Sequence, residues 1–267
     1  MVLLVDGLHK SFGGLKAVSD FSTRIRQGEI VSLIGPNGAG KTTIFNLLTG
    51  FYVPDGGSIQ FHGREIAGQK PHLIAAAGIS RTFQNIRLFG RMSVLDNVRL
   101  AFHLQKKYNL VDAIIRSKNF QQEEERITGL SLSLLKTFDL TAEQHKLARE
   151  LPYGLQRRVE IARAVATGAR LLLLDEPAAG MNRVETDELM GLIRWIRREF
   201  PLTILLIEHQ MRMIMEISER IIVLNFGEKI AEGTPEAIQK DPKVIEAYLG
   251  GGNRGKGHEG GSQGDDA

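Results

Sequence analysis

Short apolar segments alternate with longer amphipathic ones along most of this chain. The predicted strands span residues 3–5, 21–25, 30–34, 58–61, 79–82, 171–174, 203–207, 221–225 and 229–232. Strands that alternate with helices in this way are typical of an α/β fold with a largely parallel sheet. The early strands are short, alternate in polarity and are separated by turn residues such as those at 54–57. We therefore expect an antiparallel β subdomain beside an α/β core.

The strand pattern stops between residues 93 and 150, where apolar positions such as Val94, Val98, Ile127 and Leu134 follow helical periodicity. We interpret residues 93–150 as a helical subdomain inserted into a core that residues 1–92 and 151–249 form together. The last residues, 250–267, are rich in glycine and contain no aliphatic side chain larger than alanine. Such a segment cannot bury enough apolar surface to offset its ordering entropy, so we predict a disordered tail.

The composition narrows the class of protein. The sequence is 42% hydrophobic and 24% charged, as in ordinary soluble globular proteins. No apolar run reaches the roughly 18 residues of a membrane-spanning helix, and the first residues lack the pattern of a secretory signal. The absence of cysteine excludes disulfides and thiolate metal sites and is consistent with the cytoplasm. A net charge of +3 is too small to indicate a nucleic-acid partner.

A complete phosphate-binding motif follows the predicted strand at 30–34. It consists of Gly35, Pro36, Asn37, Gly38, Ala39, Gly40, Lys41, Thr42 and Thr43. In this motif backbone N–H groups surround the phosphates, the lysine reaches the terminal phosphates and the first hydroxyl binds Mg²⁺. The segment 41–48 is predicted to be a helix, whose positive N-terminal end would face the anion. The chain is therefore predicted to bind ATP or GTP with Mg²⁺, through Lys41 and Thr42.

Residues with hydrolytic chemistry follow three other predicted strands. Asp175 and Glu176 end the run at 171–174, where ligands lie in open α/β sheets. We expect Asp175 to order Mg²⁺ and Glu176 to polarise the attacking water as a general base. His209 follows the strand at 203–207 and is predicted to contact the terminal phosphate and the water. Gln84, after the strand at 79–82, is predicted to bind the metal and to connect nucleotide state to the helical subdomain.

A second glycine-containing segment, residues 151–158, leads into a predicted helix at 159–166. A helix N-terminus with free N–H groups is a further anion site. Because one chain already has a complete phosphate loop, this segment either serves the nucleotide of another subunit or is simply the start of a helix.

Together these motifs resemble the nucleotide-binding subunits of ATP-binding cassette (ABC) transporters, over residues 3–249, and most closely the ATPase subunits of branched-chain amino acid importers. The resemblance implies a RecA-like P-loop NTPase core with Walker A at 35–43, the Q-loop at Gln84, Walker B at 171–176 and the switch at His209. It implies that the adenine base of the nucleotide stacks on Phe12 and that Asn182 is part of the D-loop. It also makes 151–156 the signature segment, with Pro152, Tyr153, Gly154 and Gln156 facing the nucleotide of the other subunit.

The resemblance also implies the partners. Two such ATPase subunits would form a head-to-tail dimer with two ATP molecules between them. The resemblance favours a heterodimer over a homodimer. Two separate transmembrane permeases would dock near residues 84–97, and a periplasmic or extracellular solute-binding protein would act indirectly. The location implied is the cytoplasmic face of the inner membrane, with no nucleic-acid partner. Two positions depart from the family, since Pro152 replaces the signature serine and Asn182 replaces the D-loop aspartate.

Other functions remain open at this point. A related ABC system could carry urea or lipopolysaccharide, because the cargo never touches the cassette. A soluble ABC protein acting on ribosomes or DNA usually has two cassettes or a long coiled-coil insertion, and neither is present in this sequence. A P-loop kinase for small molecules would need neither the signature helix nor His209.

Overall fold

The computed structural model describes residues 1–105 and 110–249, and its main sheet is largely parallel. The strand order is β10-β9-β3-β8-β7-β6, and β10 alone in this sheet is antiparallel to its neighbour. The strands are β3 (Ile30–Ile34), β6 (Ile79–Arg81), β7 (Leu171–Asp175), β8 (Thr203–Ile207), β9 (Arg220–Asn225) and β10 (Glu228–Gly233). The near-continuous burial of β3, β7 and β8 explains why each is an almost uniformly apolar run. The expected α/β fold is confirmed.

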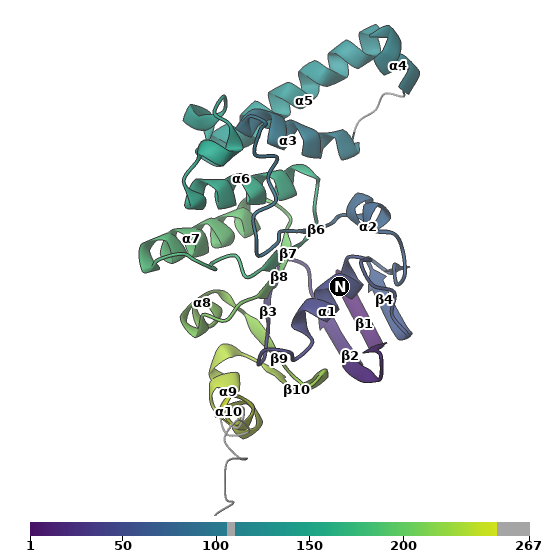
Figure 1. Ribbon diagram of the computed structural model, residues 1–267, viewed down its shortest axis with the longest axis vertical. Coiled ribbons are helices and arrows are strands. Elements are labelled where there is room, and N and C mark those ends of the chain that lie inside the picture. Colours follow the sequence, from purple (N-terminus) through teal and green to yellow (C-terminus); the bar gives the residue numbers. More distant parts are fainter. Residues whose placement is uncertain (106–109, 250–267) are drawn as a thin grey trace, which may run out of the picture.

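A second, antiparallel sheet has the order β2-β1-β4-β5. It contains β1 (Leu3–Phe12), β2 (Leu15–Ile25), β4 (Gly56–Phe61) and β5 (Arg64–Glu65). Helix α1 (Lys41–Leu48) packs between this sheet and the main one, and its residues Ile44, Phe45 and Leu47 are buried in the shared core (Figure 1). The antiparallel element predicted from the early strands is therefore present, and it lies beside the phosphate-loop helix.

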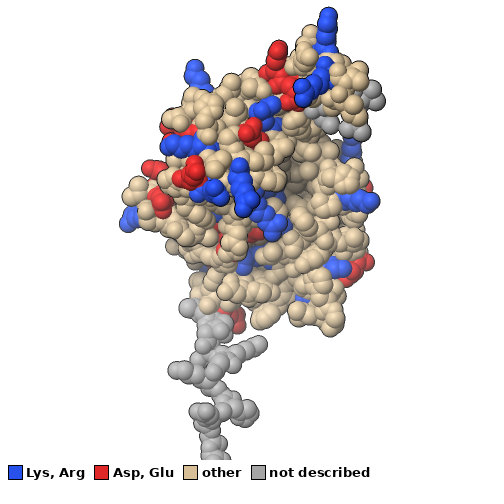
Figure 2. All heavy atoms as spheres, turned by 45° about the horizontal axis from the view of Figure 1, so that its top comes forward, with Lys and Arg blue, Asp and Glu red and all other residues tan. Residues whose placement is uncertain are grey.

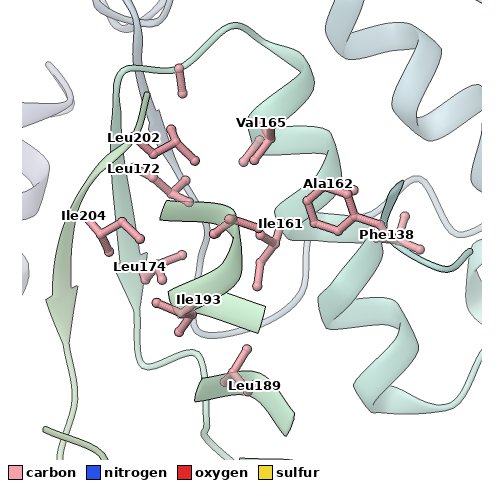
Figure 3. Packing of buried hydrophobic residues seen from close by; sticks show 14 of the residues in the cluster. Phe138, Ile161, Ala162, Val165, Leu172, Leu174, Leu189, Ile193, Leu202 and Ile204 are labelled. Carbon is pink, nitrogen blue, oxygen red and sulfur yellow. The ribbon is translucent and has the colours of Figure 1, made fainter. Parts of the chain in front are cut away.

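The other face of the main sheet is covered by α6 (Tyr153–Ala166) and α7 (Arg183–Glu199). In Figure 3, side chains of the sheet such as Leu172 and Ile204 point toward Ile161 of α6 and Ile193 of α7. The C-terminal part adds α8 (Met211–Ile217), α9 (Pro235–Gln239) and α10 (Pro242–Leu249) beside β9 and β10. This packing fixes α6, which carries the second glycine segment at its first turn, against the strand that ends in the two carboxylates.

A helical layer forms one end of the molecule, at the top of Figure 1. It contains α3 (Val94–Phe102), η1 (His103–Gln105), α4 (Leu110–Ile115), α5 (Lys118–Thr137), η2 (Thr141–Glu143) and η3 (Ala148–Glu150). Helix α3 packs on both α5 and α6. Dividing the chain into a core of 1–92 and 151–249 and a helical subdomain of 93–150 remains our proposal, and the tail predicted at 250–267 lies outside the described residues.

Some elements differ from the predicted pattern. β1 and β2 extend well beyond 3–5 and 21–25, because the outer part of their hairpin is paired by backbone hydrogen bonds but largely exposed. The short β5 and helix α2 (Pro71–Ala77), which buries only Ile74, were not predicted. Acidic and basic side chains are intermixed on the face that Figure 2 shows. Among the described residues no helix combines the length and the apolar character needed to cross a membrane.

Candidate functional site

The phosphate loop connects β3 to α1 in a conformation that only glycine allows at two positions. Gly35 has φ 151°, and a Cβ atom there would lie 2.2 Å from the carbonyl oxygen of Leu224. Gly40 has φ 101°, and its Cβ would lie 2.4 Å from the carbonyl oxygen of Ala17. The glycines therefore let the loop pack against the neighbouring backbone. No side chain caps the N-terminus of α1, so its first N–H groups are available to an anion.

Lys41 is folded back onto this loop. Its side chain is buried, and Nζ donates hydrogen bonds to the carbonyl oxygens of Gly35 at 2.7 Å and Pro36 at 3.0 Å. Burial lowers the pKa of Lys41, while the nearby charges of Glu176 and Asp175 act in the opposite direction. The ammonium group thus lies next to the space where phosphates would be held and beside both acidic residues.

A pocket of about 460 Å³ opens in front of the loop, within the range of small-molecule sites. Its lining includes Phe12, Gly38, Gly40, Lys41, Thr42 and Thr43. The ring of Phe12 is 41% exposed and packs edge to face with Tyr52, with ring centroids 5.0 Å apart. The structure therefore brings the predicted base platform and the phosphate loop to one pocket. Pro36 and Asn37 instead line a different pocket, together with Tyr248 of α10, and Ala39 borders both.

Asp175 is the last residue of β7 and is paired with an arginine that sequence reasoning did not identify. Arg81, at the end of β6, donates from Nη2 to Asp175 Oδ2 at 2.6 Å and from Nη1 to Asn46 Oδ1 at 2.7 Å. The guanidinium lies over the rings of Phe45 and Phe83. Both charged side chains are more than nine-tenths buried, so each compensates the desolvation of the other.

Glu176 is the point where three predicted site residues meet. Its Oε2 accepts a hydrogen bond of 2.7 Å from Gln84 Nε2, and its Oε1 lies 2.9 Å from Nε2 of His209. Glu176 has φ 46°, in the left-handed region that non-glycine residues seldom adopt. Such local strain is concentrated at functional sites. The loops after β6, β7 and β8 therefore converge on one carboxylate, as the sequence predicted for strand ends.

A second unpredicted residue, Glu208, holds two of these loops together. Its buried carboxylate accepts N–H groups from Ala178 at 2.8 Å, from His209 at 2.9 Å and from Gln210 at 3.3 Å. The position was visible in the sequence as a charged residue at the end of an apolar strand. The carboxylate fixes the backbone that places His209 against Glu176.

The signature segment forms the first turn of α6. Pro152 is the N-cap residue, no side chain caps the helix, and a Cβ atom at Gly154 would meet nothing within 4 Å. Pro152 and Gly154 line a pocket with Met181 that is separate from the pocket of the phosphate loop. Gln156 turns back on its own chain, donating from Nε2 to the carbonyl of Leu151 at 2.8 Å. The backbone at Gly154 is therefore open to an external ligand.

Asn182, the predicted D-loop residue, is the N-cap of α7. Its side chain accepts the N–H of Glu185 at 3.1 Å, and the Glu185 carboxylate accepts the N–H of Asn182 at 2.9 Å. This reciprocal pair is a capping box, and the spacing Asn-x-x-Glu could have revealed it. An asparagine can cap a helix as well as an aspartate does, so the substitution preserves this local role.

The oxygen donors predicted to bind the metal are chemically suited to Mg²⁺. Thr42 offers a hydroxyl, Asp175 a carboxylate and Gln84 an amide oxygen, and Mg²⁺ in nucleotide sites is held by one or two carboxylates with phosphate oxygens and water. In the described part of the chain no cluster of three or more histidine or acidic side chains is arranged to hold a metal by itself. The donor set therefore fits a metal that arrives with a nucleotide.

Comparison with known proteins places these features in a family. Residues 18–179 match the model of the family described as ABC transporter, and residues 228–253 match that of the branched-chain amino acid ATP-binding cassette transporter. The chain is 47% identical over 249 residues to the high-affinity branched-chain amino acid transport ATP-binding protein BraF of Pseudomonas aeruginosa, covering 93% of this chain and 98% of that protein. It is 46% identical, with the same coverage, to LivG of Escherichia coli.

A more distant relative and a solved structure are also ATP-binding components of transport systems. The lipopolysaccharide export system ATP-binding protein LptB of Haemophilus influenzae is 33% identical over 249 residues, covering 93% of this chain and 97% of that protein. The crystal structure of an ATP-binding cassette of an ABC transporter in its ADP conformation superposes with a TM-score of 0.80 at 30% identity, covering 93% of this chain and 98% of that one.

Proposed function

The chain belongs to the ABC transporter family, and from this premise we propose that it is the ATP-hydrolysing subunit of an importer for branched-chain or related amino acids. The observation that carries the proposal is the grouping of Gln84 and His209 on Glu176, next to a complete phosphate loop. A carboxylate that accepts side-chain hydrogen bonds from two other loops and has a left-handed backbone conformation is typical of a functional site.

Each residue has a role that its position supports. The N–H groups of the loop and Lys41 bind the β- and γ-phosphates, and Phe12 stacks on the base. Thr42, Asp175 and Gln84 would hold Mg²⁺, which when bound neutralises negative charge on the phosphates. The sandwich of the nucleotide between two subunits excludes water other than the one that reacts.

Glu176 is the general base in this proposal. It accepts a proton from the attacking water, and His209 orients both that carboxylate and the γ-phosphate. Both oxygens of Glu176 are engaged in the present structure, one by Gln84 and one by His209. When Gln84 turns toward the metal, Oε2 becomes free to accept the proton. The Q-loop residue thus acts as a switch as well as a ligand.

The signature segment would complete the nucleotide site of a second ATPase subunit. The open helix N-terminus after Pro152 supplies the N–H groups of Tyr153 and Gly154 in place of the serine hydroxyl that this chain lacks. Asn182 lies at the adjacent turn, as the cap of α7. We propose a head-to-tail pair with a sister ATPase, giving a heterodimer, with a homodimer as the alternative.

A cavity of about 560 Å³ between α2, β6, α3 and α6 is the proposed docking site for a cytoplasmic segment of a permease. Phe51, Phe89 and Leu100 line it and are 52%, 55% and 39% exposed, so they form an exposed apolar patch of the kind that marks interaction sites. Arg81 also lines the cavity, as do Arg87 and Phe89 of the segment 84–97. One permease bound at this cavity and a second bound at the sister ATPase would hold the complex at the cytoplasmic face of the inner membrane, and a solute-binding protein would act through the permeases.

The amino acid cargo is favoured over the alternatives by two comparisons. The named branched-chain amino acid proteins are 46–47% identical and the lipopolysaccharide protein 33%. The C-terminal family model also carries the branched-chain description. Membership of the ABC transporter family removes the kinase alternative.

Transport by the reconstituted complex tests the proposal. The full chain would be purified with its sister ATPase and permeases, placed in proteoliposomes with the cognate solute-binding protein, and supplied with ATP. We expect ATP-dependent uptake of labelled leucine, and none with a Lys41→Ala complex. ATP hydrolysis stimulated by urea or lipopolysaccharide, with no leucine uptake, would contradict the cargo.

A further inference from the structure

The helix that carries the signature also holds the loop that carries Gln84. Arg157 of α6 is completely buried. Its Nη1 donates to the carbonyl of Phe83 and its Nη2 to the carbonyl of Gln84, each at 2.8 Å. The neighbouring Glu160 accepts Arg157 Nη1 at 2.7 Å and the backbone N–H of Arg87 at 3.1 Å. The Gln84 loop is therefore bound to α6 on both sides of the glutamine.

The same arginine reaches the start of the signature helix. Nη2 of Arg157 also donates to the hydroxyl of Tyr153 at 3.1 Å, and that hydroxyl donates to the carbonyl of Ala179 at 3.1 Å. Ala179 belongs to the turn that begins at Glu176, because its N–H donates to the carbonyl of Glu176 at 3.1 Å. The first turn of α6 is thus connected both to the loop of Gln84 and to the turn that begins at the candidate general base, Glu176.

Stability alone does not account for a charge at this position. Burying a guanidinium costs several kcal/mol, and a buried ion pair is often no better than an apolar residue of similar size. Nε of Arg157 is buried without a hydrogen-bond partner in the described structure, which adds a further cost. What arginine provides is a planar fork that can bond two carbonyls, a carboxylate and a hydroxyl at once, which no other side chain offers.

We propose that Arg157, with Tyr153 and Glu160, is a positioning unit that transmits engagement of the signature to the hydrolytic residues of the same subunit. The proposal rests on the proposed function, in which the first turn of α6 contacts the nucleotide of the other subunit. When that turn moves, Arg157 shifts the backbone of Gln84 and the side-chain amide with it, and the hydroxyl of Tyr153 holds the guanidinium against that turn. Each subunit then hydrolyses its own ATP only when its signature is correctly seated on the ATP of its partner.

A double-mutant cycle in the assembled transporter complex tests this. The ATPase rate and the KM for ATP would be measured for wild type, Gln84→Ala, Arg157→Met and the double variant. Misplacement of a catalytic group by about 1 Å can cost about 100-fold in rate, so Arg157→Met should lower kcat by about 10- to 100-fold and leave KM within about threefold. If Arg157 acts through Gln84, the double variant is no slower than the slower single variant. Losses that multiply would overturn the proposal.

Two further variants separate positioning from stability. Arg157→Met leaves Glu160 buried without its charge partner and should also lower the melting temperature. Arg157→Lys keeps the charge beside Glu160 but has no fork, so we expect it to recover much of that melting temperature while kcat stays low. Full recovery of kcat by lysine would show that only the charge matters and would contradict the mechanism. Arg126→Met, which removes another arginine bonded to a glutamate three residues away, is the control and should leave kcat unchanged.

Tyr153→Phe keeps the proposal testable if Arg157→Met does not assemble. It removes one hydroxyl and almost no volume, and its cycle with Gln84→Ala should show the same lack of additivity, with a loss of about threefold to tenfold in kcat for the single variant. Multiplying losses would overturn the proposal here too. A wild-type complex without ATPase activity would instead refute the proposed function, so the two failures are distinguishable.

Discussion

Replacing Arg81 with methionine should destabilise the chain strongly, because it leaves Asp175 buried without its charge partner. The side chains of Arg81 and Asp175 are 6% and 9% exposed and lie 2.6 Å apart. Breaking such a pair costs about 3–5 kcal/mol. Methionine keeps the length and apolar character of the stem but lacks the guanidinium that lies over the rings of Phe45 and Phe83, so the lost ring contacts add to this cost. At about 2–4 °C per kcal/mol for a chain of this size, the melting temperature should fall by roughly 6–20 °C.

The assay is equilibrium unfolding of the nucleotide-free chain in urea, with thermal unfolding alongside. Asp175→Asn and the double variant complete the cycle, and the double variant should be more stable than Arg81→Met alone because no unpaired charge remains buried. Arg212→Met is the control, since it breaks an exposed pair with Asp187 and should change the melting temperature little. An equal fall in melting temperature for the Arg81 and Arg212 variants would refute the reasoning. So would unfolding free energies that simply add in the cycle.

Three smaller predictions concern single residues. Asn182→Ala removes the cap of α7 and should lower the free energy of unfolding, measured in urea, by about 1 kcal/mol. Asn182→Asp keeps a capping oxygen and should leave that free energy unchanged. His209→Ala should reduce the ATPase kcat and leave nucleotide affinity in a binding titration nearly intact, because the loop and Lys41 provide most of the phosphate binding whereas His209 contacts Glu176; unchanged kcat would make it structural. Burial by itself raises the pKa of Glu29, but the hydrogen bonds from Arg220 and from the N–H of Arg26, together with the charges of both arginines, outweigh it and lower that pKa below its ordinary value of about 4.5. Its stabilising contribution is therefore full above about pH 4.5 and lost below it, so the stability difference between wild type and Glu29→Gln should shrink as the pH falls through that range.

The sequence predicted the parts of the fold and site that depend on contiguous patterns. The buried strands of the main sheet and the loop at 35–43 are local signals, since a run of apolar residues or glycines is enough to identify them. Glu176 and His209 were expected at one edge of the sheet because each follows a buried strand. Gln84 was expected to bind the metal from the loop after another strand, and the structure brings the three side chains together.

What could not be predicted depends on pairs of residues far apart in the chain. Arg81 and Asp175 are separated by 94 positions, and Arg157 and Phe83 by 74. A lone arginine in sequence gives no sign of the carbonyl or carboxylate that it bonds in the fold. The outer halves of β1 and β2 were also missed, because backbone pairing in an exposed hairpin leaves little hydrophobic pattern.

In the proposed assembly, ATP is held between the phosphate loop of one subunit and the signature segment of another. The direct measurement is light scattering of Glu176→Gln with excess Mg²⁺-ATP, alone and mixed with the sister ATPase. Glutamine keeps the shape of the side chain but cannot accept the proton, so the closed state should accumulate with ATP and not with ADP. We predict an ATP-dependent dimer in the mixture. Intact ATP binding with no association in either sample would contradict the account.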